Sequence, residues 1–231
     1  MNKPAIDVAL VAWPNHPRRM AYFRRTLAAL RKNLSASRHA LRWVCSSESQ
    51  HDPARTWHGE ELEAICREHG IGLHWRIGKA ALGANMNAAL RLGAAPLIFL
   101  VQDDYELLEP LDLSPGADLL LRHGEVDLVR YSYFLDPHSG TRFKGSLEGW
   151  RRVDIDGTWP YGDDPHLRRR DFMDRWGWYL EEGRHGASES QMLLRLVHGR
   201  ATIVAADRCY FGHVGEVASV IDEYRPRAVP R

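Results

Sequence analysis

The stretch LIFLVQDDYEL, residues 97–107, sets an acidic pair directly behind an apolar run. The run LIFLV follows Pro96 and is too short for an ordinary helix, so it predicts a buried strand. After Gln102 come two adjacent carboxylates, Asp103 and Asp104. Such a pair repels itself unless a cation, a proton or a cationic partner lies between the carboxylates. The sequence therefore predicts a neutralising group at the end of this strand.

Strand-like and helix-like segments alternate along the first part of the chain. Apolar runs predict strands at residues 6–13, 41–45, 71–77 and 97–101, and apolar residues at helical spacing predict helices at 20–34, 59–69 and 85–92. This alternation implies βαβ crossovers, and hence a three-layer α/β/α fold with a mostly parallel central sheet. Ligands of such sheets bind outside the carboxyl ends of the strands, where the segments WPNHPRR, SSESQHD and QDDYE are expected.

The second half of the sequence is less regular. A strand is expected at residues 126–134, a helix at 191–198 and another strand at 201–205. Residues 136–171 contain many Pro, Gly, Arg and Trp residues without periodicity, which predicts one long functional or mobile loop. No repeat or linker divides the chain, so a single domain is predicted over residues 1–231.

Composition excludes several classes of partner. The formal net charge is +1, so there is no global field for nucleic acid, and no nucleic-acid partner is expected. No apolar stretch approaches about 18 residues, so no transmembrane segment is expected, while peripheral membrane contact stays open. Asp7 interrupts the N-terminal apolar run, which argues against a signal peptide. The three scattered cysteines are expected to be small buried hydrophobes in a reduced, cytoplasmic protein.

Three stretches carry a resemblance to a known family. GANMNAALRLGAAPLIFLVQDD contains an asparagine-bearing helix, an apolar strand and an aspartate cluster, and WPNHPRRMAYFRRTLAAL contains a first turn and helix. SESQMLLRLVHGRATIVAADRCYFGHVG supplies a late acidic residue, helix, strand and histidine. Together they resemble nucleotide-sugar-dependent glycosyltransferases of the GT-A type, closest to family 2. The resemblance implies a nucleotide-binding half over residues 1–107 and an acceptor-binding, metal-completing half over residues 108–223.

The resemblance assigns a divalent metal, Mn²⁺ or Mg²⁺, to Asp104 and His213. Such a cation offsets the charge of a departing nucleoside diphosphate and keeps coordination positions for phosphate oxygens. Asp103 is expected nearer the ribose. The family's cluster usually begins with Asp where this chain has Gln102, so that donor contact is expected to be made differently. The alternative for the acidic doublet is a pair of solvated turn residues.

Further donor contacts are expected in the turn after the first strand, the loop after the second strand and the start of the third helix. The residues are Pro14, His16, Glu48, Gly83, Asn85 and Asn87. Asp52 is an alternative to Glu48. At the third helix, small residues permit close approach of a ligand, asparagine amides hydrogen-bond a base or ribose, and the helix N-terminus favours anionic groups. The alternative reading for that helix is ordinary capping.

Glu189 is the expected general base, which takes the proton of the acceptor hydroxyl. Its alternative role is to complement the helix dipole, and Asp171 is the reserve base. Trp176 and Trp178 are expected to contact the acceptor as a platform for a sugar ring, with Tyr179 nearby and packing in the core as the alternative. The adjacent arginines 168–170 indicate a solvated loop or a site that steers anions.

These expectations combine into one function. The resemblance implies a metal-dependent glycosyltransferase that moves a sugar from a UDP-sugar donor to a saccharide or other hydroxyl acceptor with inversion, as in polysaccharide biosynthesis. A nucleotidyltransferase is the rival enzyme, but WPNHPRR lacks the glycines of a triphosphate-binding loop. Because of Gln102, a non-catalytic subunit that binds nucleotide sugars is the second rival.

Overall fold

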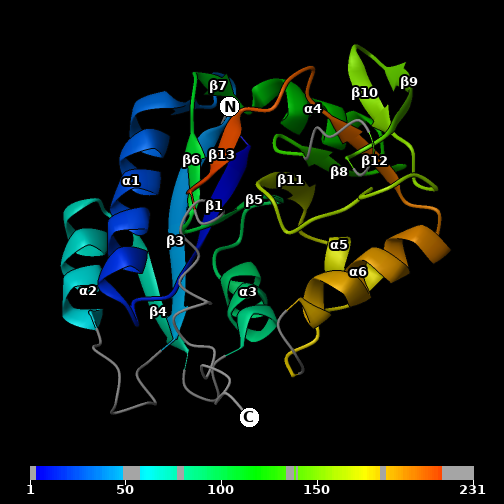
Figure 1. The fold of residues 1–231 in the computed structure, drawn as a ribbon. Coiled ribbons are helices and arrows are strands. Elements are labelled where there is room, and N and C mark those ends of the chain that lie inside the picture. The colour runs from blue at the N-terminus through cyan, green and yellow to red at the C-terminus, as the bar shows by residue number, and fades with distance from the viewer. Residues whose placement is uncertain are drawn as a thin grey trace, which may run out of the picture.

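The computed structural model describes residues 4–48, 58–76, 81–133, 138, 140–182 and 186–214, which form a mixed sheet with helices on both faces (Figure 1). The helices are α1 (Pro17–Asn33), α2 (Gly59–Glu68), α3 (Leu82–Arg91), α4 (Ser114–Arg122), α5 (Phe172–Trp176) and α6 (Ala187–His198). The strands are β1 (Ala5–Ala12), β2 (Leu34–Ser35), β3 (Ala40–Glu48), β4 (Gly72–Arg76), β5 (Leu97–Gln102), β6 (Tyr105–Leu107), β7 (Leu111–Asp112), β8 (Val126–Arg130), β9 (Phe143–Leu147), β10 (Trp150–Val153), β11 (His166–Arg169), β12 (Thr202–Ala205) and β13 (Phe211–His213).

The main sheet has the strand order β4-β3-β1-β5-β11-β8-β12-β10-β9. β1 pairs in parallel with β3 and β5, and β3 pairs in parallel with β4, because the crossover helices return the chain to the same edge before each new strand. β11 lies antiparallel between β5 and β8, and β10 lies antiparallel to both β12 and β9. All strands of this sheet except β10 and β11 therefore run in one direction.

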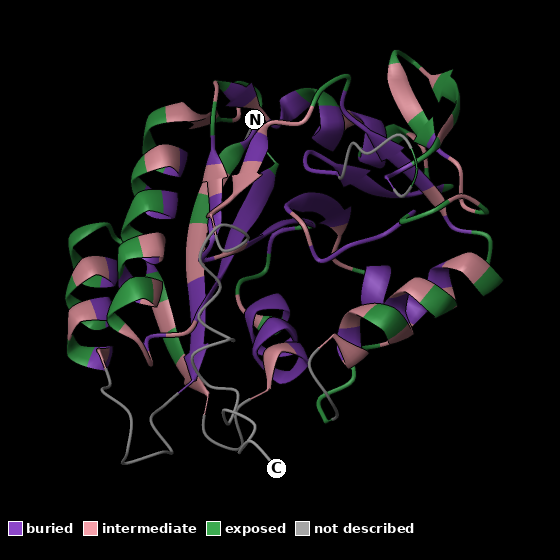
Figure 2. Cartoon of the chain, in the orientation of Figure 1, coloured by how far each residue is buried: buried purple, intermediate pink, exposed green. Residues whose placement is uncertain are grey.

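Alternate residues of the central strands feed two separate core layers. On β1, Ile6, Val8 and Leu10 pack with α1, α2 and α4, whereas Ala9 and Val11 pack with α3, α5 and α6. The central strands are accordingly buried along their length (Figure 2). A strand that is covered on both faces favours apolar residues at nearly every position, which explains the unbroken run before the acidic doublet.

The predicted three-layer α/β/α arrangement is confirmed. Every strand and helix expected in the first part of the chain is present, with ends shifted by a few residues; the helix expected to begin at Asn85, for example, begins at Leu82. The second-half expectations correspond to β8, α6 and β12. Within the described residues no helix combines the length and apolarity needed to cross a membrane. Cys45 and Cys66 are buried free thiols, and Cys209 is a half-buried one.

The expectation of one long loop over residues 136–171 is wrong. Its described residues include the β9–β10 hairpin and β11, which lies in the middle of the sheet. The arginine-rich sequence of β11 hides its position, because Arg168 is fully buried with its guanidinium over the rings of Phe172, at 4.8 Å, and Tyr179, at 5.6 Å. The expected solvated arginine loop is therefore part of the core.

Arg170, directly after β11, joins three elements at the amino edge of the sheet. It donates hydrogen bonds to Asp7 Oδ2 at 2.5 Å and to the carbonyl oxygens of Leu90 at 2.9 Å and Ala95 at 2.6 Å. The Asp7 side chain is 1% exposed and also accepts the backbone N–H of Ala95 at 2.8 Å. The last carbonyls of a helix lack partners within it, and Arg170 caps α3 by binding one of them. The same guanidinium is the counterion of Asp7.

We expect Arg170→Ala to lower the free energy of unfolding by about 3 to 5 kcal/mol, because it leaves the buried Asp7 carboxylate without a counterion. Urea denaturation followed by circular dichroism measures this loss. The matched control is Arg200→Ala, since the Arg200 ion pair with Asp156 is 66% and 60% exposed, and it should cost less than about 1 kcal/mol. Equal losses in the two variants would contradict the assignment.

Candidate functional site

The site lies at the edge of the sheet where β1, β3, β5 and β8 end. Antiparallel β11 begins at that edge, because its first residue, His166, pairs with late residues of β5 and β8. Asp163 and Asp164, which precede β11, therefore lie at the same edge as Asp103 and Asp104, which follow β5. The topology thus brings together two acidic doublets that are far apart in the sequence.

Helix α1 presents an arginine to the first doublet. His16 caps the helix by accepting the backbone N–H of Arg18 at 3.0 Å, and Pro17 occupies its first position, where no donor is needed. Arg19 follows in the first turn. Its Nη1 donates to Asp104 Oδ2 at 2.7 Å, and its Nη2 donates to Asp103 Oδ1. The cationic group between the two carboxylates is thus a guanidinium of the protein itself.

The doublet is almost fully buried, and its two carboxyls have different surroundings. Asp103 Oδ2 accepts the backbone N–H of Trp13 at 2.9 Å, and the Asp103 side chain is 1% exposed. Burial raises the pKa of Asp103 against the attraction of Arg19. Burial also opposes ionisation of Asp104, but the hydrogen bond with His213 and the charge of Arg19 outweigh it and lower the pKa of Asp104. Asp104 is therefore the more acidic of the two carboxyls.

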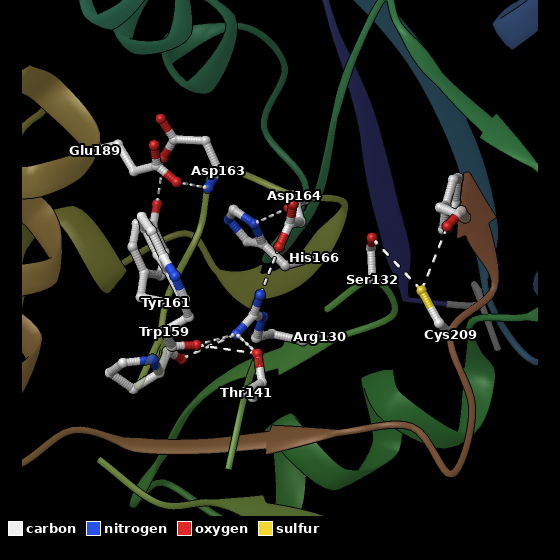
Figure 3. Close-up of polar contacts among 12 residues, drawn as sticks. Arg130, Ser132, Thr141, Trp159, Tyr161, Asp163, Asp164, His166, Glu189 and Cys209 are labelled. Atoms are coloured by element: carbon white, nitrogen blue, oxygen red, sulfur yellow. Dashed lines mark hydrogen bonds and ion pairs between the residues drawn. The ribbon is translucent and has the colours of Figure 1, made fainter. Parts of the chain in front are cut away.

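The structure brings His213 to Asp104 through a short ribbon of β6 and β13. His213 pairs with Tyr105, the residue after the doublet, and its Nε2 lies 3.3 Å from Asp104 Oδ2. The rings of His213 and Tyr105 stack at 4.6 Å with an interplanar angle of 8°. Tyr105 donates its hydroxyl to Asp164 Oδ1 at 2.7 Å. Arg130 donates to Asp164 Oδ2 at 2.5 Å (Figure 3). This chain of contacts fixes the imidazole beside the first doublet.

Asp163 and Glu189 lie next to each other, close to Asp164 (Figure 3). Glu189 Oε1 accepts the backbone N–H of Asp163 at 3.2 Å, and Tyr161 donates its hydroxyl to Asp163 Oδ1 at 2.8 Å. Asp163 Oδ2 is buried and has no hydrogen-bond partner among the described residues. Burial, with the nearby charge of Glu189, raises the pKa of Asp163 to about 7. A carboxyl that holds its proton near neutral pH thus lies beside the expected base.

The other residues expected to contact the nucleotide-sugar donor form hydrogen bonds within the protein at this edge. Gln102 donates through Nε2 to the carbonyl of Asp163 at 3.0 Å, which ties the end of β5 to the second doublet. The carbonyl of Pro14, a buried residue, accepts the N–H of His58 at 2.8 Å. Glu48 is 4% exposed, and its Oε1 accepts the N–H of Ala81 at 2.8 Å. Glu48 also pairs with Arg76, whereas its alternative, Asp52, lies outside the described residues.

The two asparagines of α3 face protein groups. Asn85 Oδ1 accepts the Ser46 hydroxyl at 2.6 Å, and Asn85 Nδ2 donates to the carbonyl of Ala12 at 3.0 Å. Asn87 pairs with the backbone of Tyr179 through two 3.0 Å hydrogen bonds. The capping alternative is wrong for both, because the helix starts at Leu82 and their side chains lie within it. Their amides join α3 to neighbouring segments.

Gly83 allows the chain after α5 to approach α3. A Cβ at this position would lie 2.1 Å from the carbonyl oxygen of Leu180 and 2.9 Å from Ser188 Cβ. The small residue therefore permits contact between protein segments. The expectation that a ligand comes close to the backbone at Gly83 is therefore wrong, because Leu180 and Ser188 fill that space.

Two further expectations are corrected by the sheet topology and burial. Trp176 is 8% exposed and donates Nε1 to Asp127 Oδ1 at 3.0 Å, so it belongs to the core and forms no platform. Asp171 follows antiparallel β11 and therefore lies at the amino edge, opposite the doublets, which removes it as a reserve base. Trp178 is 38% exposed and stacks with the guanidinium of Arg91 in the last turn of α3, also away from the doublets.

The residues present suit a cation that arrives with its own ligands. Asp104 Oδ1 is buried without a hydrogen-bond partner in the described part of the chain, and the His213 imidazole lies against the same carboxylate. One carboxylate and one imidazole fit Mg²⁺ or Mn²⁺ when phosphate oxygens and waters fill the other positions. Among the described residues no group of three or more His, Cys, Asp or Glu side chains is arranged to hold a metal.

Known proteins match this chain in structure. No protein-family model matches the sequence, and no curated protein matches it. TarS of S. aureus superimposes with a TM-score of 0.62 and 16% identity over 90% of this chain and 36% of TarS. TarS 1–349 in complex with UDP gives 0.59 and 14% over 90% of this chain and 59% of that one. TarS 1–349 in complex with UDP-GlcNAc gives 0.60 and 14% over 91% and 60%.

The expected GT-A type of α/β fold is confirmed by this likeness, which at such identities bears on the fold alone. The chain spans less than two thirds of each of these TarS chains. Sequence reasoning missed four residues of the site: Arg19, Tyr105, Asp163 and Asp164. The second DD, in YGDDPHLRR, was the available signal, since it also adjoins a strand. The strand that follows this doublet, β11, is rich in arginine, so the sequence did not identify it as a strand.

The raised pKa of Asp163 predicts a specific pH dependence of stability. The folded protein binds this proton more tightly than the unfolded chain does, so the contribution of Asp163 is full below about pH 4 and falls as the pH rises towards 7. We expect Asp163→Asn to remove a decline on the order of 3 kcal/mol between pH 4 and 8.

Urea unfolding at several pH values measures the difference between wild type and Asp163→Asn. The matched control is Asp207→Asn, whose side chain is 65% exposed, and it should leave the slope unchanged. Parallel curves for wild type and Asp163→Asn would refute the assignment.

Proposed function

We propose that this chain is a glycosyltransferase that moves a sugar from a nucleotide-sugar donor to a hydroxyl acceptor. The observation that carries the proposal is the Asp104–His213 pair at the carboxyl edge of the sheet. One buried oxygen of that carboxylate has no hydrogen-bond partner among the described residues. Ligands of open α/β sheets bind at that edge. TarS structures of the same fold contain UDP and UDP-GlcNAc, which supports a UDP-sugar as the donor.

Asp104 and His213 would hold a divalent cation, Asp104 through Oδ1 and His213 through its imidazole. When bound, such a cation offsets negative charge on the diphosphate leaving group. Tyr105 keeps the imidazole in place by stacking, and Asp164 with Arg130 keeps Tyr105 in place. The ligand pair is therefore oriented before the donor arrives, which lowers the cost of assembling the site.

Glu189 would accept the proton of the attacking hydroxyl. It is half-buried in the first turn of α6, and the backbone N–H of Asp163 orients one of its carboxylate oxygens. A carboxylate beside the donor site would suit a single displacement with inversion at the sugar carbon. Trp178 has no place in this proposal, because it lies near the amino edge of the sheet.

A binding protein without turnover is the second candidate, favoured by one observation. Arg19 already neutralises the acidic doublet, and Gln102 uses its amide to hold the second doublet. Calorimetry with UDP and UDP-GlcNAc, run beside an assay for UDP release, separates the two candidates. Binding accompanied by release supports the enzyme, whereas binding without release over hours identifies the binding protein.

We expect Asp104→Asn to reduce UDP release from the donor by about 100-fold or more, because the amide cannot supply the charge that a divalent cation needs. The assay is run with Mn²⁺ and with EDTA. Glu109→Gln is the matched control, since Glu109 is partly exposed in an ion pair with Arg208, and it should keep wild-type activity. Full activity of Asp104→Asn, or equal wild-type activity in EDTA, would remove the metal from the proposal.

We expect Glu189→Gln to lower the transfer rate by about 10² to 10⁴ while donor affinity stays within a factor of two, as for loss of a general base. Single-turnover transfer and donor calorimetry measure the two quantities. Glu182→Gln, at an exposed position before α6, is the matched control. A variant that loses donor affinity and rate together would assign Glu189 to binding instead.

A further inference from the structure

The arginine between the two carboxylates is an integral part of the site. Arg19 uses both terminal nitrogens on the doublet, one for each carboxylate, and its side chain is only 14% exposed. The ring of Trp13 lies 5.8 Å from its guanidinium carbon. Although burial opposes the charged form, the two carboxylates raise the pKa of Arg19 further above its ordinary value. Because an arginine guanidinium is not deprotonated in proteins, Arg19 is a permanent cation at this position.

The contacts of the doublet show which oxygens are already in use. Asp103 employs Oδ1 for Arg19 and Oδ2 for the backbone of Trp13. Asp104 employs Oδ2 for Arg19 and His213. Of the four carboxylate oxygens of the doublet, Asp104 Oδ1 alone has no hydrogen-bond partner in the described part of the chain. Nε of Arg19 also has none there. A divalent cation would meet one open carboxylate oxygen, next to a positive charge.

The charge count makes binding of a bare metal unfavourable. Even with both carboxyls ionised, the doublet and its guanidinium carry no more than a single net negative charge, and the repulsion between a divalent cation and Arg19 grows as the solvent is excluded. A nucleoside diphosphate changes this balance, because its anionic oxygens attract both the cation and a guanidinium, for which phosphate is a bidentate partner.

We propose that Arg19 is a built-in counter-cation that holds the doublet in place of a divalent metal, so that metal and nucleoside diphosphate bind only together. Arg19 would then donate its hydrogen bonds to the diphosphate, and Asp104 would bind the metal in place of the guanidinium. This inference rests on the proposed function for the identity of the incoming anion. It adds an order of events: the metal has low affinity for the empty protein and high affinity for the protein with diphosphate.

The test measures Mn²⁺ binding without nucleotide, by the loss of the free Mn²⁺ electron-paramagnetic-resonance signal. We expect Arg19→Met, which keeps the length of the side chain without its charge, to bind Mn²⁺ at least about tenfold more tightly than wild type. Added UDP should tighten Mn²⁺ binding to wild type and so narrow the difference in Mn²⁺ affinity between wild type and Arg19→Met. Arg25→Met is the matched control on the same helix, since its ion pair with Glu106 leaves Arg25 59% exposed, and it should bind Mn²⁺ as wild type does.

Thermal unfolding keeps the test decisive if Arg19→Met folds poorly. Loss of the guanidinium leaves two buried carboxylates without a counterion, so we expect this variant to unfold at lower temperature than wild type in EDTA. Millimolar Mn²⁺ should raise its unfolding temperature more than that of wild type, because a bound cation replaces the lost charge. Arg19→Lys keeps one positive charge but cannot reach both carboxylates as a fork, and is expected between the two.

Two results would overturn the inference. One is equal Mn²⁺ affinity of wild type and Arg19→Met together with equal Mn²⁺ stabilisation. The other is tight Mn²⁺ binding by wild type without any nucleotide. Failure of the proposed function is a separate result, since it would appear as no binding of UDP or UDP-GlcNAc to wild type, while the nucleotide-free Mn²⁺ comparison would keep its meaning.

Discussion

A carboxylate removed from water must meet a cation or keep its proton, and this constraint governs both edges of the sheet. At the amino edge, Asp7 meets Arg170. At the carboxyl edge, Asp164 meets Arg130, a side chain only 2% exposed, while Asp163 solves the same problem by a raised pKa. These pairings join segments that lie far apart in the sequence. The acidic doublet after β5 belongs to the same system, with Arg19 as the cation shared by its two carboxyls.

The strands of the first part of the chain were predictable because burial on both faces determines their composition. Strands covered on both faces are mostly apolar, so β1 and β5 stand out in the sequence, and the helical crossovers between successive strands fix parallel pairing. The place of Asp103 and Asp104 at a carboxyl end follows from that pairing. The neighbourhood of Asp104 and His213 followed only from a family resemblance, since the ribbon that joins them has three residues on each strand.

The later part was not predictable because its burial depends on partners distant in sequence. Arg168 is a core residue only because two aromatic rings cover it, and a run of arginines by itself indicates a solvated loop. Asn87 shows the same limit, since an amide that binds a backbone segment is indistinguishable in sequence from one that binds a ligand. Trp176 was ambiguous in sequence, and its contact with Asp127 decided in favour of the core.

The β6–β13 ribbon has a consequence for biosynthesis. A ribosome delivers residues 105–107 long before residues 211–213, so during translation the strands of the first half can pair while the imidazole is still absent. Arg19 is already present at that stage and can neutralise the doublet as it becomes buried. The nascent chain can therefore bury its acidic pair against Arg19 before the last ribbon closes and brings the imidazole to Asp104.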